Sequence, residues 1–461
     1  MNPKRQSPKS PVSSARTAAF DILLRVEQES SYASELLHSK ACAELSRPDH
    51  ALATELVMGV IRWRSRLDDE IATASSLPLS KLDLEIVVAL RLALYQFRWL
   101  DRIPARAALH ESVELVKRAR KRSAAAFVNA VLRKLSGIAR NDASGAGQNV
   151  QSPDELARDF SHPRWLVERW ASEYGLTAAK KICSYNQSAP ATTIRLRSPG
   201  AAEQLREEGI TLDRGALLSS ARRVAGGDIT KTNAFRHRHI VIQDEASQLV
   251  AALVSQALVG NSTILDCCAA PGGKTLAIAD RNRQASIIAV ELHPHRARLL
   301  QKLLQAATPA VRVHLVVADA QHLPTSSSFD RVLTDVPCSG TGTLARNPEI
   351  KWRLCPVDLK DLQARQSGIL QSAMAQVAPG GRLIYSSCSL EKEENEDVVV
   401  QALTQNGSFR LLDCALELDR LGGNGELVWR EPAMLTRGPY LRTIPGIHPC
   451  DGFFAAILER N

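Results

Sequence analysis

The stretch STILDCCAAPGGKTLAIAD, residues 262–280, joins a short apolar strand to a helix through a turn of small residues. Its two glycines, Gly272 and Gly273, allow the backbone to approach a ligand closely, and the N-terminus of the following helix favours a negatively charged group. A strand, a Gly-rich turn and a helix in this order predict a ligand-binding turn at the edge of a parallel sheet.

A phosphate-binding P-loop is the competing interpretation of this turn, because that loop requires Gly-x-x-x-x-Gly-Lys-Ser/Thr. Gly273, Lys274 and Thr275 satisfy the last three positions. However, Cys268 stands where the first glycine is needed, and Pro271 stiffens the turn. The pattern therefore disfavours an NTPase without excluding one.

Short apolar strands alternate with amphipathic helices after this turn. We expect strands at residues 286–290, 311–317, 330–334, 381–386 and 452–458, and helices at residues 293–306, 357–377 and 391–403. Such alternation predicts a doubly wound, mostly parallel α/β sheet of the Rossmann-like type, in which ligands bind beyond the carboxyl ends of the strands.

Acidic residues end three consecutive strands of this predicted sheet: Asp266, Glu291 and Asp319. An acid about twenty residues beyond the Gly-rich turn suits hydrogen bonds to the ribose hydroxyls of a nucleoside-type cofactor, and Glu291 is so placed. Asp319 is suited to accept a hydrogen bond from an adenine amino group. One such acid would be an ordinary loop carboxylate, whereas three in succession favour a cofactor site.

Two cysteines end the next two strands: Cys338 lies in DVPCSGTG, residues 335–342, and Cys388 lies in SSCS, residues 386–389. Both thiols are therefore expected at one edge of the sheet, within reach of one substrate. A thiolate that adds to carbon 6 of cytosine makes carbon 5 nucleophilic, which is covalent catalysis. Asp335 is placed to stabilise charge near N3 and the 4-amino group of the base. The spacing alone does not separate the roles of the two cysteines.

Composition limits the remaining possibilities. The 461 residues, 44% hydrophobic and 23% charged, indicate two or three globular domains. Nine cysteines include no CxxC pair, so we expect no metal site. No apolar stretch is long enough to span a bilayer, and the basic first ten residues precede no apolar segment typical of a signal peptide. We therefore expect a cytoplasmic protein without a membrane partner.

The N-terminal third differs from the rest in pattern and charge. Residues 1–140 contain 23 Lys and Arg against 15 Asp and Glu, a net charge of +8 out of +9 for the whole chain. This charge indicates a polyanionic partner or, alternatively, a solubilising surface. The expected divisions are a disordered tail at 1–14, a helical domain at 15–136, a linker at 137–157, a small α+β RNA-binding subdomain at 158–245 and a catalytic domain at 246–461.

Three long motifs closely resemble the signatures of the RNA cytosine-5 methyltransferases: DCCAAPGGKT at 266–275, DVPCSGTGTLARNPEIKWR at 335–353 and YSSCSLEKEENEDVV at 385–399. QDEASQ, residues 243–248, fits the same pattern. The resemblance implies that Cys388 is the nucleophile and that Cys338 assists release of the methylated base. It also implies that S-adenosylmethionine is bound by Cys268, Ala269, Ala270, Pro271, Gly272, Gly273, Lys274, Glu291, Asp319 and Asp335.

The helical part resembles NusB-like RNA-binding domains, through ELVMGVIRWR at 55–64, LALYQFRWLDRIPARAALHESVELVK at 92–117 and FVNAVLRKL at 127–135. The fusion of the two domains is similar to the bacterial small-subunit rRNA methyltransferase B family. This resemblance implies a monomer that methylates carbon 5 of one cytosine of 16S rRNA, conventionally position 967, in naked rRNA or an early assembly intermediate. The alternatives are a tRNA cytosine-5 methyltransferase and a non-catalytic RNA-binding factor.

Overall fold

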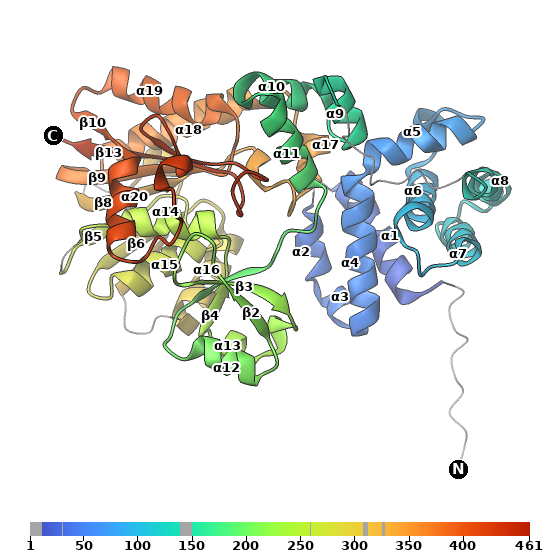
Figure 1. Ribbon diagram of the computed structural model, residues 1–461, viewed down its shortest axis with the longest axis horizontal. Coiled ribbons are helices and arrows are strands. Elements are labelled where there is room, and N and C mark those ends of the chain that lie inside the picture. Colours follow the sequence, from blue (N-terminus) through green and yellow to red (C-terminus); the bar gives the residue numbers. More distant parts are fainter. Residues whose placement is uncertain (1–11, 30, 139–149, 259, 308–311, 325–327) are drawn as a thin grey trace, which may run out of the picture. The chain divides into compact units, whose positions relative to one another are not determined.

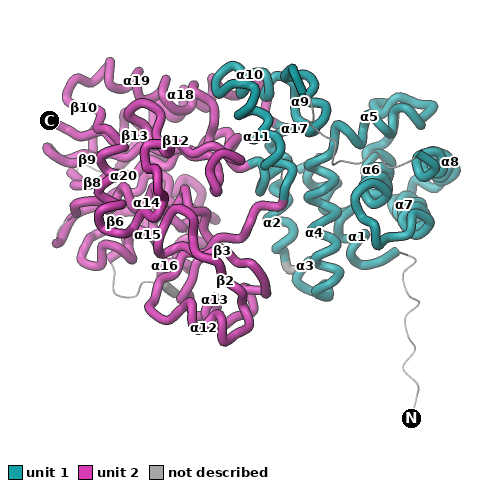
Figure 2. The backbone as a smooth tube through the Cα atoms, viewed as in Figure 1, with its two compact units in different colours: residues 1–188, 344–353 teal, residues 189–343, 354–461 magenta. Residues whose placement is uncertain are grey.

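The computed structural model describes residues 12–29, 31–138, 150–258, 260–307, 312–324 and 328–461 (Figure 1). The chain forms two compact units, which Figure 2 distinguishes by colour. Unit 1 comprises residues 1–188 and 344–353, and unit 2 comprises residues 189–343 and 354–461. The chain thus leaves unit 2 after Thr343 and returns to it at Leu354.

Unit 1 is helical in its described residues, as the spacing of its apolar residues predicts. Helix α6 (Leu84–Trp99) is buried on all sides from Ile86 to Phe97, because it is the central helix. The helices around it are α1 (Ser14–Gln28), α4 (Arg47–Arg62), α5 (Arg64–Ala74), α7 (Ala105–Arg118) and α8 (Ala125–Ser136). The unit also contains α2 (Ala33–Leu37), α3 (Lys40–Ala43), α9 (Pro153–Asp159), α10 (Arg164–Tyr174), α11 (Leu176–Asn186) and α17 (Ile350–Arg353).

The predicted tail and linker fall partly outside the described residues. Residues 1–11 and 139–149 are not described, whereas α1 begins at Ser14 and α9 begins inside the expected linker and continues to Asp159. Helix α9 begins at a Ser–Pro pair: the Ser152 hydroxyl accepts from the backbone N–H of Glu155, and Pro153 occupies the first helical position.

Unit 2 is built on the predicted doubly wound sheet. Its parallel part has the strand order β9-β8-β5-β6-β7, so the order reverses beside β5. The ends of β5 and its neighbours therefore form the ligand-binding edge typical of such sheets. These strands are β5 (Thr263–Asp266), β6 (Ser286–Glu291), β7 (Arg312–Val317), β8 (Phe329–Asp335) and β9 (Val377–Ser387).

Helices cover both faces of this sheet because successive strand residues point to opposite sides. Ile264, Leu333 and Ile384 pack in one core with residues of α14 (Glu245–Ser255), α15 (Gly273–Arg281) and α20 (Cys414–Gly423). Their neighbours Leu265 and Val332 pack in another core with α18 (Asp358–Met374) and α19 (Glu396–Gln405). A smaller core includes Leu300 and Leu304 of α16 (Pro294–Ala307).

The structure corrects two of the expected helices. The helix expected at 357–377 ends at Met374, because Val377 already pairs with Phe329 as the first residue of β9. The helix expected at 391–403 is instead a short 3-10 turn, Lys392–Glu394, followed by α19. Asn395 separates the two with φ −122° and ψ −102°, which is not a helical conformation.

Antiparallel strands extend the sheet beyond β9. Of these strands, only the last one, expected at residues 452–458, was predicted from the sequence. Strand β13 (Phe453–Arg460) pairs with β9, and β12 (Tyr440–Thr443) and β11 (Thr436–Arg437) continue the sheet beyond it. Strand β10 (Phe409–Leu412) also pairs with β13. These added strands are short, so their sequence periodicity is too weak to distinguish them from loops.

The small subdomain of unit 2 contains a four-stranded antiparallel sheet of order β2-β3-β1-β4. Its strands are β1 (Thr193–Leu196), β2 (Thr211–Arg214), β3 (Ala221–Gly226) and β4 (Ile240–Ile242), accompanied by α12 (Ala201–Glu207) and α13 (Asn233–Arg236). The predicted mixture of strands and helices is confirmed for residues 189–245, whereas residues 158–188 of the expected subdomain belong to unit 1. Across the described part of both units, every helix is too short or too polar to cross a bilayer.

Candidate active site

The Gly-rich turn leads from β5 into α15 and places several predicted cofactor residues at the end of the strand. Gly272 has φ +108°, and a Cβ atom built on it would lie 2.5 Å from Cδ1 of Leu300. Only glycine fits this position, because both the backbone conformation and the nearby leucine exclude a side chain. The turn can therefore hold the start of α15 close against α16.

Asp266 is the buried acid at the start of this turn. One carboxylate oxygen accepts a hydrogen bond from the Thr275 hydroxyl at 2.7 Å, whereas the other has no protein partner. Burial raises the pKa of Asp266 to about 6. A buried carboxylate oxygen without a partner fits a ligand that brings positive charge, as S-adenosylmethionine does through its sulfonium and amino groups.

Glu291 and Asp319 lie at the ends of β6 and just after β7, so with Asp266 they follow three adjacent parallel strands. Glu291 is 4% exposed and accepts from the backbone N–H of His293 at 2.9 Å. Asp319 accepts from the backbone N–H of Gln321 at 2.9 Å. In each acid only one carboxylate oxygen accepts a hydrogen bond from the backbone. The second oxygen is therefore suited to accept from a hydroxyl or amino group of a cofactor.

Cys268 and its neighbours complete the predicted cofactor set. Burial raises the pKa of the Cys268 thiol well above its ordinary value, and the charges of Asp266, Asp335 and Glu291 raise it further. This influence of three acids shows that the turn and the strand ends share one region. Ala269 is buried, Ala270 is half-buried and Pro271 is exposed on the same turn.

Lys274 makes an ion pair that the sequence did not predict. Its amino group lies 2.7 Å from Oδ2 of Asp335, and the other oxygen of Asp335 accepts from the Ser386 hydroxyl at 2.9 Å. Asp335 therefore joins the Gly-rich turn to the ends of β8 and β9. A lysine held by a carboxylate is poorly suited to a phosphate, which weakens the NTPase alternative further.

The two predicted cysteines lie side by side, with their Sγ atoms 3.2 Å apart. Both are half-buried. The hydrogen bond to Cys388 and then burial raise the pKa of Cys338 well above its ordinary value. At this distance either thiol can donate a hydrogen bond to the other. We call residues 335–343 and 386–389 the cysteine loops.

A close backbone approach ties the cysteine loops together. The backbone N–H of Gly342 donates to the carbonyl oxygen of Cys388 at 2.9 Å. A Cβ atom on Gly342 would lie 2.2 Å from the carbonyl oxygen of Gly452, so glycine is required there. The sequence motif supplied this glycine, but its structural reason is visible only in the fold.

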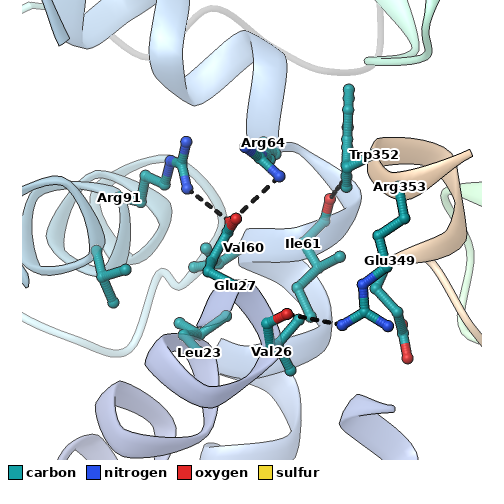
Figure 3. A pocket seen from close by; sticks show the side chains of 11 residues that line it. Leu23, Val26, Glu27, Val60, Ile61, Arg64, Arg91, Glu349, Trp352 and Arg353 are labelled. Atoms are coloured by element: carbon teal, nitrogen blue, oxygen red, sulfur yellow. Dashed lines mark hydrogen bonds and ion pairs between the residues drawn. The ribbon is translucent and has the colours of Figure 1, made fainter. Parts of the chain in front are cut away.

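The last ten residues of the same motif belong to unit 1, and we call residues 344–353 the anchor segment. Lys351 is 1% exposed, and its amino group lies 2.9 Å from the carbonyl oxygens of both Arg62 and Ser161. The indole N–H of Trp352 donates to the carbonyl oxygen of Ile61 at 2.7 Å. Arg353 donates to the carbonyl oxygen of Val26 at 2.7 Å (Figure 3).

A pocket of about 180 Å³ lies where the anchor segment meets the helices of unit 1. Glu27 reaches into it and forms ion pairs with Arg64 at 3.2 Å and Arg91 at 3.1 Å (Figure 3). The Arg64 guanidinium lies 5.7 Å from the centre of the Trp352 ring. Glu27 thus pairs with Arg64 and Arg91 in this pocket, and the predicted site residues are absent from its lining.

Comparison with protein families matches three parts of the chain. Residues 254–459 match the family described as 16S rRNA methyltransferase RsmB/F, and residues 13–137 match the NusB family. Residues 162–227 match the ferredoxin-like domain of RsmF/B-like methyltransferases.

Relatives match over the whole length of the chain. A probable ribosomal RNA small subunit methyltransferase B from Bacillus subtilis is 33% identical over 97% of this chain and 99% of its own. A putative methyltransferase from Mycobacterium tuberculosis is also 33% identical, over 100% of both chains. A ribosomal RNA small subunit methyltransferase B from Vibrio cholerae is 29% identical over 98% of both chains.

Solved structures share the fold. The crystal structure of PH0851 matches with a TM-score of 0.79 and 22% identity over 99% of this chain and 100% of its own. A methyltransferase homologue from Pyrococcus horikoshii matches with a TM-score of 0.56 and 24% identity over 68% of this chain and 100% of its own. The predicted fold, a NusB-like helical domain with a Rossmann-like methyltransferase domain, is confirmed.

Proposed function

Since the chain belongs to the RsmB/F family of 16S rRNA methyltransferases, which depend on S-adenosylmethionine, we propose that it methylates carbon 5 of one cytosine, position 967, of 16S rRNA. The observation that carries the proposal is the pair of thiols 3.2 Å apart beside Asp335. Two thiols at one substrate site suit a reaction in which one forms a covalent bond and the other assists its breakage.

The proposed reaction begins at Cys388. Its thiolate adds to carbon 6 of cytosine, a new S–C bond forms, and the electrons of the C5–C6 double bond make carbon 5 nucleophilic. After methylation at carbon 5, the proton on that carbon leaves to a base, the double bond re-forms and the S–C bond breaks. Cys338 assists this release, because its raised pKa keeps its proton available beside the departing sulfur.

Asp335 is proposed to contact N3 and the 4-amino group of the base. Its two oxygens already accept from Lys274 and Ser386, but each carboxylate oxygen can accept more than one hydrogen bond. Lys274 and Ser386 therefore hold the carboxylate in one orientation, which stabilises charge on the base without reorganisation.

S-adenosylmethionine supplies an electrophilic methyl group when bound. We propose that the side chains and backbone of the Gly-rich turn and the three strand-end acids hold it: Cys268, Ala269, Ala270, Pro271, Gly272, Gly273, Lys274, Glu291, Asp319 and Asp335. The unpaired oxygen of Asp266 is a further contact for the positive charge of the cofactor, and the sequence had singled this acid out only by its position.

The RNA is proposed to contact the helical domain, residues 15–136, and the subdomain at 158–245, while residues 246–461 perform the chemistry. The net charge of residues 15–136, 19 Lys and Arg against 15 Asp and Glu or +4, supports the first assignment, because lysine and arginine neutralise phosphates and release counterions. We propose a cytoplasmic monomer that acts on naked rRNA or an early assembly intermediate.

The experiment that tests the function is bisulfite mapping of total RNA from cells with and without the protein. The expected result is loss of one 5-methylcytosine, at position 967 of 16S rRNA, with no loss in tRNA. Purified protein and labelled S-adenosylmethionine should then methylate a 16S rRNA transcript. Loss of a tRNA site instead would replace the proposed substrate, and no loss of any 5-methylcytosine would overturn the proposed reaction.

A further inference from the structure

Glu394 is a fully buried carboxylate that lies behind both cysteine loops. It ends the 3-10 turn Lys392–Glu394, which follows Cys388 by a few residues. One of its oxygens accepts from the backbone N–H of Ser339 at 2.8 Å and from the side-chain amide of Gln366 at 2.9 Å. The other accepts from the hydroxyls of Ser339 and Ser389.

The two serines that donate to Glu394 are the direct sequence neighbours of the two cysteines. Ser339 follows Cys338 directly, and Ser389 follows Cys388 directly. Their hydroxyl oxygens lie 3.0 Å apart. A single carboxylate therefore bonds to the residue after each thiol, although Ser339 and Ser389 are fifty positions apart in the sequence.

The backbone segment that carries the Glu394 side chain is itself fixed by hydrogen bonds. The Tyr385 hydroxyl donates to the carbonyl oxygen of Glu394 at 2.6 Å. The next residue, Asn395, accepts from the Ser387 hydroxyl at 2.5 Å and donates to the carbonyl oxygen of Ser389 at 3.0 Å. Both ends of the Cys388 loop are thus bonded to the segment that carries Glu394.

A buried carboxylate is costly, and this cost indicates a role beyond packing. Removing a charge from water is unfavourable unless hydrogen bonds compensate, and apolar residues of similar size often stabilise a core as well or better. Here four donors satisfy Glu394, and three of them come from the cysteine loops.

We propose that Glu394 is a positioning residue that sets the separation and orientation of the Cys338 and Cys388 thiols; the proposal rests on the function proposed above. Glu394 acts through Ser339 and Ser389 and does not touch the substrate. Because a misplacement of about 1 Å can cost a reaction roughly 10²-fold, the network governs the rate of the thiol chemistry rather than substrate binding.

The first test compares Glu394→Gln with wild type in steady-state methylation. The glutamine side chain has nearly the same volume as glutamate, but its NH₂ group replaces one of the oxygens that accept from the serines and Gln366. Two donors then face each other, and part of the network is lost. We expect kcat to fall about 100-fold, on the scale of such a misplacement, while KM for rRNA and Kd for S-adenosylmethionine stay close to wild type. Glu394→Asp, which keeps the charge but shortens the reach, should recover part of the loss.

Glu417→Gln is the matched control. Glu417 is also buried, 3% exposed, but it pairs with Arg382 and Arg420 and has no bond to a cysteine loop. Its variant should keep the wild-type kcat. An equal loss of kcat in both variants would overturn the proposal, because the effect would then follow from removing any buried charge.

The second test measures thiol geometry without methyl transfer. Diamide accepts two electrons and two protons from Cys338 and Cys388, which become a disulfide while diamide becomes the hydrazine. Peptide mass spectrometry distinguishes the disulfide between Cys338 and Cys388 from any disulfide formed by the other cysteines, so its rate of formation can be followed separately. Sγ atoms 3.2 Å apart should cross-link rapidly, and Glu394→Gln should slow the reaction at least about tenfold.

Ser339→Ala and Ser389→Ala keep the proposal falsifiable if Glu394→Gln does not fold, since each removes one arm of the network. Each should slow the cross-link by a smaller factor. Wild-type cross-linking rates in folded Glu394→Gln, or in both serine variants, would overturn the positioning role. Because this measurement needs no RNA or cofactor, it separates failure of the positioning role from failure of the methyltransferase proposal.

Discussion

The cysteine loop at residues 335–343 and the anchor segment at residues 344–353 are consecutive parts of one sequence motif but have different surroundings. Residues 335–343 carry Cys338 at the end of β8 in unit 2, where the thiol is half-buried beside Cys388. Residues 344–353 follow without a break and are built into unit 1, where Lys351 is 1% exposed and contacts two backbone carbonyl oxygens. One continuous motif therefore contains both a thiol of the candidate active site and a buried lysine that bonds to the backbone of unit 1.

This difference teaches that a charged residue inside a catalytic motif need not act on the substrate. Burial lowers the pKa of Lys351 well below its ordinary value, and Arg62 lowers it further. Such a shift is often a sign of catalysis. Here the amino group instead donates to the carbonyl oxygens of Arg62 and Ser161, which makes it a structural contact of unit 1.

Replacement of Cys388, the proposed nucleophile, is the change with the largest expected effect on this comparison. Cys388→Ala should reduce methyl transfer by about 10³-fold or more, because the proposed bond from this thiol to carbon 6 can no longer form. Binding of S-adenosylmethionine, measured by calorimetry, should stay nearly unchanged. Substantial residual methylation would show that Cys388 is not the nucleophile.

Replacement of the other thiol should have a different signature. Cys338→Ala should slow release, so a covalent RNA–protein complex should accumulate and survive denaturing electrophoresis. Turnover should fall about 10²-fold or more, the scale of a lost acid–base group. The double variant with Cys388→Ala should form no complex. If the single variant forms none either, Cys338 does not assist release.

A substitution in the anchor segment should lower the free energy of unfolding of unit 1 and should not act on the chemical step. Lys351→Ala leaves a cavity and removes the donor of the Ser161 carbonyl oxygen, while the Arg62 carbonyl oxygen still accepts from the side-chain amide of Gln187 at 3.0 Å. We expect the variant to destabilise unit 1 by about 2–4 kcal/mol. Urea unfolding followed by tryptophan fluorescence measures this, since Trp63, Trp99, Trp165, Trp170 and Trp352 belong to unit 1. The exposed Lys360→Ala is the control and should change stability by less than about 0.5 kcal/mol. An unchanged unfolding midpoint in Lys351→Ala would refute the anchoring role.

Deletion of residues 1–136 would not separate these effects. The truncated chain would lose the carbonyl oxygens of Ile61 and Arg62, which Trp352 and Lys351 contact. Weakened RNA binding in such a chain would then reflect disruption of the anchor segment as well as loss of the helical domain. Point variants are therefore the sharper test.

A pH effect of smaller size is expected near the anchor segment. His162 is buried; its Nδ1 donates to the carbonyl oxygen of Phe160 at 2.7 Å, and its Nε2 accepts from Asn186 at 3.3 Å. Burial, and then the charge of Lys351, lowers the pKa of His162 well below 6.5. The unfolded chain therefore binds more protons below pH 6.5, so the stability of unit 1 should fall as the pH drops below that value.

The slope of this effect should be at most about 1.4 kcal/mol per pH unit. Urea unfolding at pH 7.5, 6.0 and 5.0 should show it in wild type, and His162→Gln should be less stable but lack this contribution to the slope. The exposed His322→Gln should retain the wild-type slope. An identical slope in the His162 variant would contradict the assignment.

Much of the fold and part of the candidate site followed from local patterns. The strand, Gly-rich turn and helix at 262–280 predicted the sheet and its ligand edge, because alternation of strands and helices leaves few possible topologies. The acids and cysteines were found by their position after successive strands. The end of the helix before Val377 was not predicted, since strand pairing overrides local helical spacing there. The break at Asn395 was not predicted either, since the side chain of this residue bonds to Ser387 and Ser389 of the neighbouring loop.

The sequence by itself determined which chemical groups stand at the strand ends and to which family they belong, because those groups follow directly from strand order and motif. Only the tertiary structure decided their partners: Lys274 pairs with Asp335, Cys338 lies 3.2 Å from Cys388, Glu394 joins the two cysteine loops and Lys351 belongs to the helical unit. These contacts join residues far apart in the chain, and spacing along a sequence carries no information on which side chains meet when sheets and helices pack.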